Sequence, residues 1–371
     1  MNAAGNDRPV LFVTNLVPPD RRGAFAALHE REDVTFALFG GRALHHSPGE
    51  EDLPFPHLRV SQRDVRGLAG SGDYRAVVGS TGGRVALPAA LTGARRARVP
   101  FLLWSSIWAH PRSVAGAAGF LPLRRIYRTA DAVVTYGPHV SAYVRSRGAR
   151  NVHEAPQAVD NSFWSARSYP QPVRELAAAG LGGEPGFIAL FVGRTERQKG
   201  LGELVEAWRA VRTSTTGAVL VLVGVAADAP QVYGEEGVVA VGKRPYEELR
   251  NFYAAADVLV VPSVPTRTVR ETWGLVVNEA MCQSTPVIAT DAVGAAAGGL
   301  VRPERNGLVV PAGEPAALAE ALQRVADDDD LRARLGAAAR EDVGAHTFDA
   351  WAEGFSAALA SVQASRAGKD C

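Results

Sequence analysis

The sequence contains few cysteines, the residues that form disulfides in exported proteins and bind metals in cysteine-rich sites. Only Cys282 and Cys371 are present among 371 residues, which is too few for a disulfide framework or a cysteine-rich metal site. The longest apolar runs are strand-sized, well below the roughly 20 residues that a membrane helix requires. No basic leader with a small-residue cleavage site precedes the first apolar run. We therefore expect a cytoplasmic protein with reduced thiols.

Lysine is also scarce, and charge is unevenly distributed. Lys occurs only at positions 199, 243 and 369, whereas the net charge is +1. Residues 1–165 contain 20 Arg, no Lys and 13 acidic residues, which gives the two halves net charges of +7 and −6. This asymmetry fits a solvated, Arg-rich surface, the interpretation we favour, or contact with an anionic partner such as a membrane surface. The Arg clusters lack interleaved aromatics, so nucleic acid is not expected.

Glycine fingerprints for dinucleotides or nucleoside triphosphates are missing too. Gly67, Gly70 and Gly72 do not stand between a strand and a helix, and the turn at 193–200 lacks the Gly-Lys-Ser/Thr ending of a phosphate-binding loop. A hydride-transfer enzyme or an ATPase is therefore disfavoured.

Short apolar runs alternate with helical periodicities along the whole chain, as in parallel sheets flanked by helices. The pattern predicts an α/β protein with two doubly wound, Rossmann-like domains that face a central cleft. We expect a first domain over 1–165, a linker over 166–186, a second domain over 187–345 and a last helix over 346–371. Strands are predicted at 10–14, 34–39, 58–60, 76–79, 101–104, 132–136, 152–155, 187–193, 218–224, 238–241, 258–262, 287–290 and 308–310.

Two cations follow the predicted strand over 187–193. Arg194 and Lys199 lie in a polar turn before a helix with apolar Leu201, Leu204, Val205 and Trp208. An Arg fork and a Lys ammonium at the carboxyl end of a strand suit a diphosphate. The competing interpretation is that both cations pair with Glu196 or Glu203 in a solvated turn.

A second segment places two carboxylates around a predicted helix start. The helix is expected to open near Gly274, where the amides of Gly274, Leu275 and Val276 would form an anion site. Glu279 on its first turns can accept from the two hydroxyls of a ribose, and Glu271 on the preceding loop can bind sugar hydroxyls. The alternative is that both carboxylates only cap and solubilise the helix.

Together, GRTERQKG at 193–200 and ETWGLVVNEAMCQSTPVIATDAVG from Glu271 resemble the retaining nucleotide-sugar glycosyltransferases of family 4, which have the GT-B fold. The resemblance is strong over about 187–345. It implies that Arg194 and Lys199 hold the donor diphosphate, Glu279 the ribose and Glu271 the sugar. It also implies a UDP- or GDP-sugar donor, no metal requirement, retention at the anomeric carbon, and a final helix near Trp351 that crosses back to the first domain.

The first domain departs from this family. Many members have a glycine pair after the first strand and a His directly after the strand that corresponds to 101–104. This chain has NLVPPDRRG at 15–23, and its His110 comes several residues late, so His110 is either a catalytic or a structural residue. Two alternatives to a sugar transferase stay open: a related sugar phosphate synthase or pseudo-glycosyltransferase, and a non-catalytic partner that keeps the fold.

Overall fold

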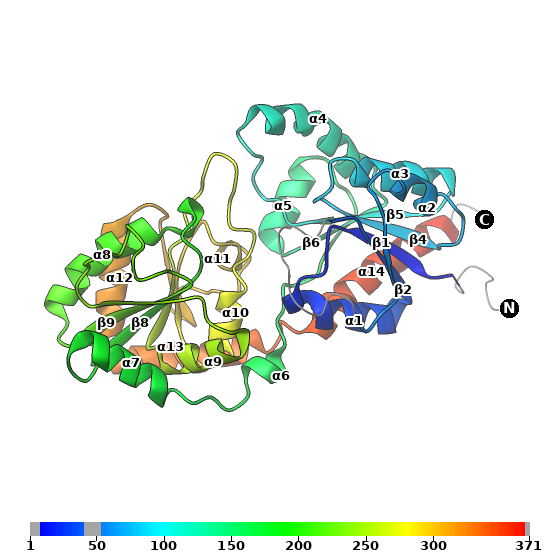
Figure 1. Ribbon diagram of the computed structural model, residues 1–371. Coiled ribbons are helices and arrows are strands. Elements are labelled where there is room, and N and C mark those ends of the chain that lie inside the picture. Colours follow the sequence, from blue (N-terminus) through cyan, green and yellow to red (C-terminus); the bar gives the residue numbers. More distant parts are fainter. Residues whose placement is uncertain (1–7, 41–52, 368–371) are drawn as a thin grey trace. The chain divides into compact units, whose positions relative to one another are not determined.

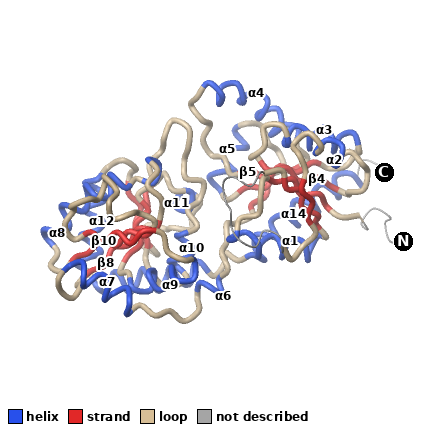
Figure 2. The backbone as a smooth tube through the Cα atoms, in the orientation of Figure 1, coloured by secondary structure: helices blue, strands red, loops and turns tan. Residues whose placement is uncertain are grey.

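The computed structural model describes residues 8–40 and 53–367, so Cys371 and Lys369 lie outside the described residues. The chain forms two compact units, one from residues 1–160 with 347–371 and the other from residues 161–346. Each unit has its own group of strands flanked by helices (Figures 1 and 2). No helix among the described residues is long and apolar enough to cross a membrane.

The first unit contains a parallel sheet of seven strands in the order β3-β2-β1-β4-β5-β6-β7. The order reverses direction beside β1, the arrangement of a doubly wound sheet. The register pairs Val10 with both Val34 and Ala76. The strands are β1 (Val10–Thr14), β2 (Val34–Leu38), β3 (His57–Arg59), β4 (Ala76–Ser80), β5 (Phe101–Ser105), β6 (Ala132–Thr135) and β7 (Val152–Glu154).

Alternating residues of β1 face two separate cores. Phe12 packs with Phe25, Trp104 and Phe355 on the face covered by α1 and α14. Leu11 packs on the opposite face, which α2, α3, α4 and α5 cover. The helices are α1 (Arg22–Glu32), α2 (Val65–Ala69), α3 (Ala86–Arg96), α4 (Val114–Thr129), α5 (Pro138–Ser146) and α14 (Phe348–Ala367), with the 3₁₀ turn η1 (Pro19–Arg21) before α1.

The second unit repeats the plan with six parallel strands in the order β10-β9-β8-β11-β12-β13. They are β8 (Phe187–Val192), β9 (Ala218–Val223), β10 (Val238–Gly242), β11 (Val258–Val261), β12 (Val287–Thr290) and β13 (Gly307–Val310). Its helices are α6 (Asn161–Trp164), α7 (Gln171–Leu181), α8 (Leu201–Ser214), α9 (Tyr246–Ala255), α10 (Val276–Met281), α11 (Gly294–Ala297), α12 (Pro315–Asp327) and α13 (Asp329–Val343), with the 3₁₀ turn η2 (Arg197–Lys199) before α8.

The predicted α/β class with two Rossmann-like sheets is confirmed, and each predicted strand is present within two residues of its expected ends. The structure divides the chain after residue 160, not 165, and again after 346. The stretch 166–186, expected to be a linker, contains α7 and belongs to the second unit. This helix buries Val173 and Ala177, because its apolar positions recur at a helical spacing within the Pro-rich stretch.

The terminal helix α14 belongs to the first unit. Its Trp351, Phe355 and Leu359 are at most 2% exposed and complete the core on the α1 face of the sheet. The two ends of the second unit meet, since Asn161 Nδ2 donates to the Val343 carbonyl at 3.2 Å. The thiol of the buried Cys282 donates to Asn161 Oδ1 at 3.7 Å.

Candidate functional site

The turn that carries Lys199 is fixed against the end of the neighbouring strand β11. Gly200 has φ +71°, and a Cβ at this position would stand 1.8 Å from the Pro262 carbonyl oxygen. The Val264 amide also donates to the Gln198 carbonyl at 2.9 Å. Only glycine permits this approach of two backbones, so the sequence at 199–200 places Lys199 beside the carboxyl end of β11.

The two predicted diphosphate ligands have different environments. Lys199 Nζ lies 2.6 Å from Glu271 Oε2, and the two side chains are 23% and 15% exposed. Arg194 Nη1 lies 3.0 Å from Glu196 Oε1, and its side chain is 70% exposed. Arg194 therefore has the solvated pairing with Glu196 that the competing interpretation predicts, whereas Lys199 pairs with neither Glu196 nor Glu203. In the same turn, Arg197 takes Glu203 as its partner.

Glu271 is held at the carboxyl ends of three strands. Ser263, two residues beyond β11, donates to Glu271 Oε2 at 3.3 Å. The Glu271 backbone forms a parallel bridge with Val293, which follows β12. Since Lys199 follows β8, the carboxylate is positioned by β8, β11 and β12 together. This is the edge at which parallel α/β sheets bind ligands.

The backbone after Glu271 is equally constrained. A Cβ on Gly294 would come within 2.0 Å of the Thr272 carbonyl oxygen, and the Ala295 amide donates to the Trp273 carbonyl at 2.8 Å. The Trp273 side chain is 3% exposed, and its indole N–H donates to Asn278 Oδ1 at 2.8 Å. Trp273 and Asn278, which sequence reasoning did not assign, thus anchor the loop that carries Glu271.

The helix after this loop starts later than predicted. α10 begins at Val276, not Gly274, and has six residues. Gly274, at φ +92°, forms a turn in which its carbonyl accepts from the Val277 amide at 3.0 Å. Within residues 8–40 and 53–367, no acceptor is recorded for the amides of Gly274 and Leu275. Of the three amides expected to form an anion site, those of Gly274 and Leu275 therefore lie in a turn, and that of Val276 lies at the first residue of the helix.

Glu279 is a buried carboxylate on α10. It is 6% exposed, and Tyr253 Oη on α9 donates to its Oε2 at 2.6 Å. Burial, with the nearby Glu279 carboxylate, raises the pKa of Tyr253 well above its ordinary value, so the phenol keeps its proton. Tyr253 fixes the orientation of the Glu279 side chain. No local sequence signal connects these residues, because they lie 26 positions apart on different helices.

His110 lies in the first unit, in the loop between β5 and α4. Its Nε2 donates to the Gly116 carbonyl at 2.7 Å, which assigns Nδ1 as the acceptor from Tyr143 Oη at 3.5 Å. The ring also makes an edge contact with Phe120. These contacts join the loop to α4 and α5, and a catalytic role for His110 stays a prediction.

A buried cation at the carboxyl edge of the first sheet was not predicted. Arg21, in η1 directly after the β1 loop, is 8% exposed, and its guanidinium carbon lies 5.5 Å from the Tyr136 ring centroid and 6.0 Å from that of Trp104. Its Nη1 has no hydrogen-bond partner among the described residues, although Asp20 lies 3.7 Å from its Nε. The residue stands where the family's glycine pair was expected.

The acidic run at 327–330 caps a helix. Asp328 is the N-cap of α13, and its Oδ1 accepts from the Leu331 amide at 2.8 Å. Asp327 ends α12, and Asp329 and Asp330 begin α13, so the run lies at the junction of these two helices. Across the described part of the chain, no group of three or more His, Cys, Asp or Glu residues is arranged to hold a metal ion.

A family model matches part of the second unit. Residues 186–328 match the model described as "Glycosyl transferases group 1". Over this stretch the chain is similar to the glycosyltransferase domain that the model describes. The stretch contains every predicted donor-site residue named above, from Arg194 to Glu279.

Curated proteins that are similar to part of this chain carry the name D-inositol 3-phosphate glycosyltransferase. The protein of Corynebacterium diphtheriae is 41% identical over 113 residues, which cover 30% of this chain and 24% of the relative. That of Nocardia farcinica is 34% identical over 214 residues, covering 53% and 46%. The chain therefore spans between a quarter and a half of the length of these relatives.

Solved glycosyltransferase structures share the architecture of the whole chain. HepE of Anabaena, in complex with UDP and glucose, has a TM-score of 0.74 at 18% identity and covers 95% of this chain and 100% of that structure. Sucrose-phosphate synthase of Thermosynechococcus elongatus has a TM-score of 0.70 at 22% identity, with coverage of 96% and 100%. The chain has the GT-B fold.

Proposed function

We propose that this protein transfers a sugar from a nucleoside diphosphate sugar to a hydroxyl group of an acceptor, with retention of anomeric configuration. The observation that carries the proposal is the meeting of Lys199 and Glu271 at the carboxyl ends of β8 and β11, within the stretch that matches the group 1 glycosyltransferase model. An ammonium and a carboxylate at this edge supply the two functions that the donor requires: a cation for the diphosphate and an acceptor for sugar hydroxyls.

In this proposal the bound donor breaks the ion pair between Lys199 and Glu271 and becomes the new partner of both side chains. The diphosphate binds the Lys199 ammonium, Arg194 swings from Glu196 onto the same phosphates, and the turn amides of Gly274 and Leu275 donate to phosphate oxygens. Glu279, held by Tyr253, accepts from the ribose hydroxyls. Charge that develops on the leaving diphosphate then faces preorganised donors, which is the main source of rate acceleration in such a site.

Glu271 orients the sugar and does not attack it. Ser263 donates to its Oε2 at 3.3 Å, which fixes the direction of the carboxylate after Lys199 has turned to the diphosphate. We therefore infer same-face substitution through an ion-pair transition state, in which the leaving diphosphate accepts the proton of the incoming hydroxyl. No covalent glycosyl-enzyme step is required in this scheme.

The donor proposed first is a UDP-sugar, because HepE is solved with UDP and with UDP-glucose. The acceptor proposed first is a phosphorylated polyol, because the curated relatives are named D-inositol 3-phosphate glycosyltransferases. The first unit is the proposed acceptor domain. Its Arg21 stands at the carboxyl edge of the sheet, where α/β sheets bind ligands.

A thermal-shift panel of UDP-, GDP- and dTDP-sugars tests the donor assignment. A ligand at 100 times its dissociation constant stabilises the folded state by about 2.7 kcal/mol, which gives a clear rise in melting temperature. Release of nucleoside diphosphate from the stabilising donor, with and without inositol phosphate, then tests turnover. Stabilisation without release or transfer across a broad acceptor panel would favour a non-catalytic partner, and no stabilisation by any nucleotide sugar would reject the proposal.

A further inference from the structure

Charge within the first unit is segregated between the two faces of its sheet. The four helices α2, α3, α4 and α5 carry seven Arg residues and no Asp, Glu or Lys. On the opposite face, α1 and α14 carry three Arg against four acidic residues. The whole stretch 61–150 contains 14 Arg and three Asp, a net charge of +11. The basic character of the first half thus comes from one side of one unit.

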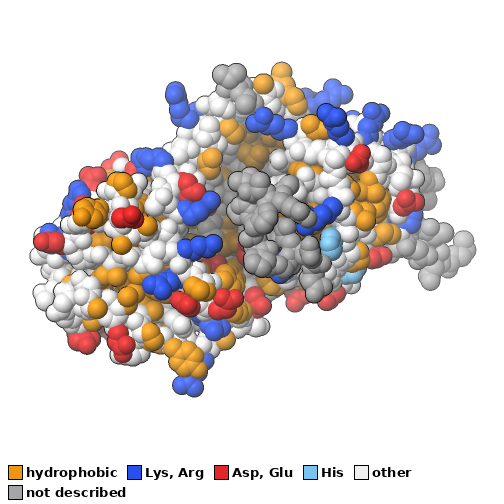
Figure 3. Space-filling view, viewed as in Figure 1, with side chains coloured by type: hydrophobic (Ala, Val, Ile, Leu, Met, Phe, Trp, Pro, Cys, Tyr) orange, Lys and Arg blue, Asp and Glu red, His pale blue; other side chains and the backbone are white. Residues whose placement is uncertain are grey.

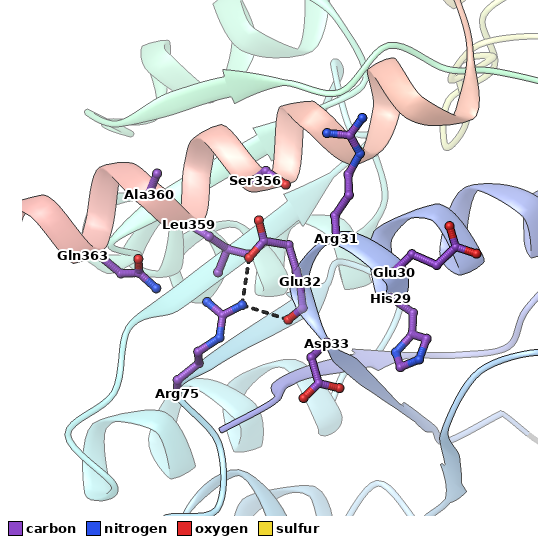
Figure 4. A pocket seen from close by; sticks show the side chains of 10 residues that line it. All are labelled: His29, Glu30, Arg31, Glu32, Asp33, Arg75, Ser356, Leu359, Ala360 and Gln363. Carbon is purple, nitrogen blue, oxygen red and sulfur yellow. Dashed lines mark hydrogen bonds and ion pairs between the residues drawn. The ribbon is translucent and has the colours of Figure 1, made fainter. Parts of the chain in front are cut away.

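These seven arginines have no carboxylate partners. Within the described residues, none of them takes part in an ion pair. Ion pairs of this unit include that of Arg31 with Asp349 and that of Arg75 with Glu32, which Figure 4 shows. Exposed arginines of the second unit behave differently, since Arg209 pairs with Glu235 and Arg324 with Glu304. Seven unpaired cations on one face repel one another unless an external anion balances them.

The same face exposes apolar side chains on α4. Leu121 is 69% exposed, more than any other large aliphatic side chain among the described residues. The exposed Pro122 follows it. Arg124, Arg125 and Arg128 follow within two turns and are all exposed, whereas Ile126 and Tyr127 face the core. Figure 3 shows blue side chains gathered along the α2–α4 side of the unit, with orange ones among them.

We propose that the face formed by α2, α3, α4 and α5 binds the surface of a bilayer that contains anionic lipids. Unpaired arginines supply attraction to phosphate headgroups, and Leu121 supplies an apolar side chain that enters the interface between them. The exposed leucine favours a bilayer over nucleic acid, which offers no apolar layer for an aliphatic side chain. This proposal does not depend on the identity of donor or acceptor.

Vesicle co-sedimentation of the full chain tests this surface. The probes are vesicles of phosphatidylcholine alone and vesicles of phosphatidylcholine with about 30% phosphatidylglycerol, an anionic lipid. The test variant is Arg124→Ser/Arg125→Ser/Arg128→Ser. Its matched control is Arg209→Ser/Arg212→Ser/Arg324→Ser, which removes the same charge from paired arginines of the second unit. We expect the test variant to lose about a hundredfold in partitioning onto anionic vesicles, and the control to stay within threefold, since each basic residue near an anionic surface contributes about 1 kcal/mol.

A second variant, Leu121→Ser, leaves the charge unchanged and separates insertion from attraction. We expect it to lower partitioning several-fold without altering the salt dependence. Circular dichroism and binding of UDP are measured on each variant, so that misfolding or loss of the donor site is distinguished from loss of vesicle binding. No binding of the wild type to anionic vesicles, equal binding to neutral ones, or tighter Arg-dependent binding to duplex DNA than to vesicles would each overturn the proposal.

Discussion

Lys199 and Glu271 are 72 positions apart in the sequence, and their Nζ and Oε2 atoms lie 2.6 Å apart at the carboxyl edge of the second sheet. Each group is the counter-ion of the other in the unliganded chain. A diphosphate that binds Lys199 must replace this partner, so substitutions at the two positions have opposite expected effects on nucleotide affinity. The first two predictions rest on this exchange.

Removal of the Lys199 ammonium should weaken nucleoside diphosphate binding. Lys199→Ala and Arg194→Ala each remove a charge-assisted hydrogen bond, with an expected loss of about 1.5–3 kcal/mol, or roughly 10- to 150-fold in the dissociation constant. Arg197→Ala is the matched control, because Arg197 lies in the same turn and pairs with Glu203. Calorimetric titration with UDP measures all three. Unchanged affinity in both test variants contradicts the diphosphate assignment.

The two glutamates should separate nucleotide binding from sugar transfer. Glu279→Ala removes the proposed ribose acceptor, and affinity for UDP and for the intact donor should fall alike. Glu271→Gln frees Lys199 from its counter-ion, so UDP affinity should be retained or rise while transfer falls sharply. Titration with UDP followed by a transfer assay checks both. Equal loss of UDP binding in the two variants means that the division of roles is wrong.

Tyr253 should act through Glu279. Tyr253→Phe removes the hydrogen bond to a carboxylate that is 6% exposed, and we expect the free energy of unfolding to fall by about 1–3 kcal/mol. UDP affinity should fall too, and less than in Glu279→Ala. Chemical denaturation and calorimetry measure the two effects. A Tyr253→Phe protein with wild-type UDP affinity would show that the Glu279 orientation does not matter for the nucleotide.

Gly200 and Gly202 form a matched pair for the backbone contact that positions Lys199. Gly200→Ala combines a left-handed backbone with a Cβ 1.8 Å from the Pro262 oxygen, so we expect a loss of about 2–5 kcal/mol in unfolding free energy. Gly202→Ala lies in α8, where an added Cβ meets no atom within 4 Å, and should stabilise by about 0.5 kcal/mol. Thermal unfolding compares them. Equal stability in the two variants would show that the turn can move away from β11.

Acid should destabilise the fold through His346, which packs beside Trp273 at a ring distance of 6.1 Å. Burial lowers the pKa of His346 below its ordinary 6.5. The unfolded chain then binds the proton more readily than the folded chain, so stability present above pH 6.5 is lost as pH falls toward the folded-state pKa. In His346→Gln, the free energy of unfolding measured by chemical denaturation should depend less on pH over this range. Parallel plots of unfolding free energy against pH for wild type and variant would assign the acid sensitivity to other groups.

The sheets were predictable because most strands are short apolar runs between turn residues, a signal that is local in the sequence. Val10–Thr14 and Val287–Thr290 have the predicted ends. Ion pairing was not predictable, since Lys199 had nearer carboxylates at Glu196 and Glu203 and took neither. The start of α10 was missed because the Gly274 turn uses a left-handed φ that no helical periodicity reveals.

The site residues divide in the same way. Glu271 and Glu279 were identified from residue type and spacing on one stretch of chain. Tyr253, Trp273 and Asn278 were missed, because each acts by holding another side chain and carries no motif of its own. His110 was considered because the resembled family has a His after the strand that corresponds to 101–104. Its contacts with Gly116 and Tyr143 follow from the path of the α4 loop, which the sequence does not specify.

The hydrogen bond between Asn161 and Val343 brings the two ends of the second unit together. In the sequence this unit is inserted, as one continuous segment, between the two segments of the first unit. Residues 161–346 can accordingly be expressed as one uninterrupted piece, whereas the first unit needs segments from both ends of the chain. A protein cut short before α14 would lack Trp351 and Phe355, so the damage from a C-terminal deletion falls on the core that begins at Val10. Protease sites near 160 and 346 would release the second unit intact and leave the first unit in two fragments.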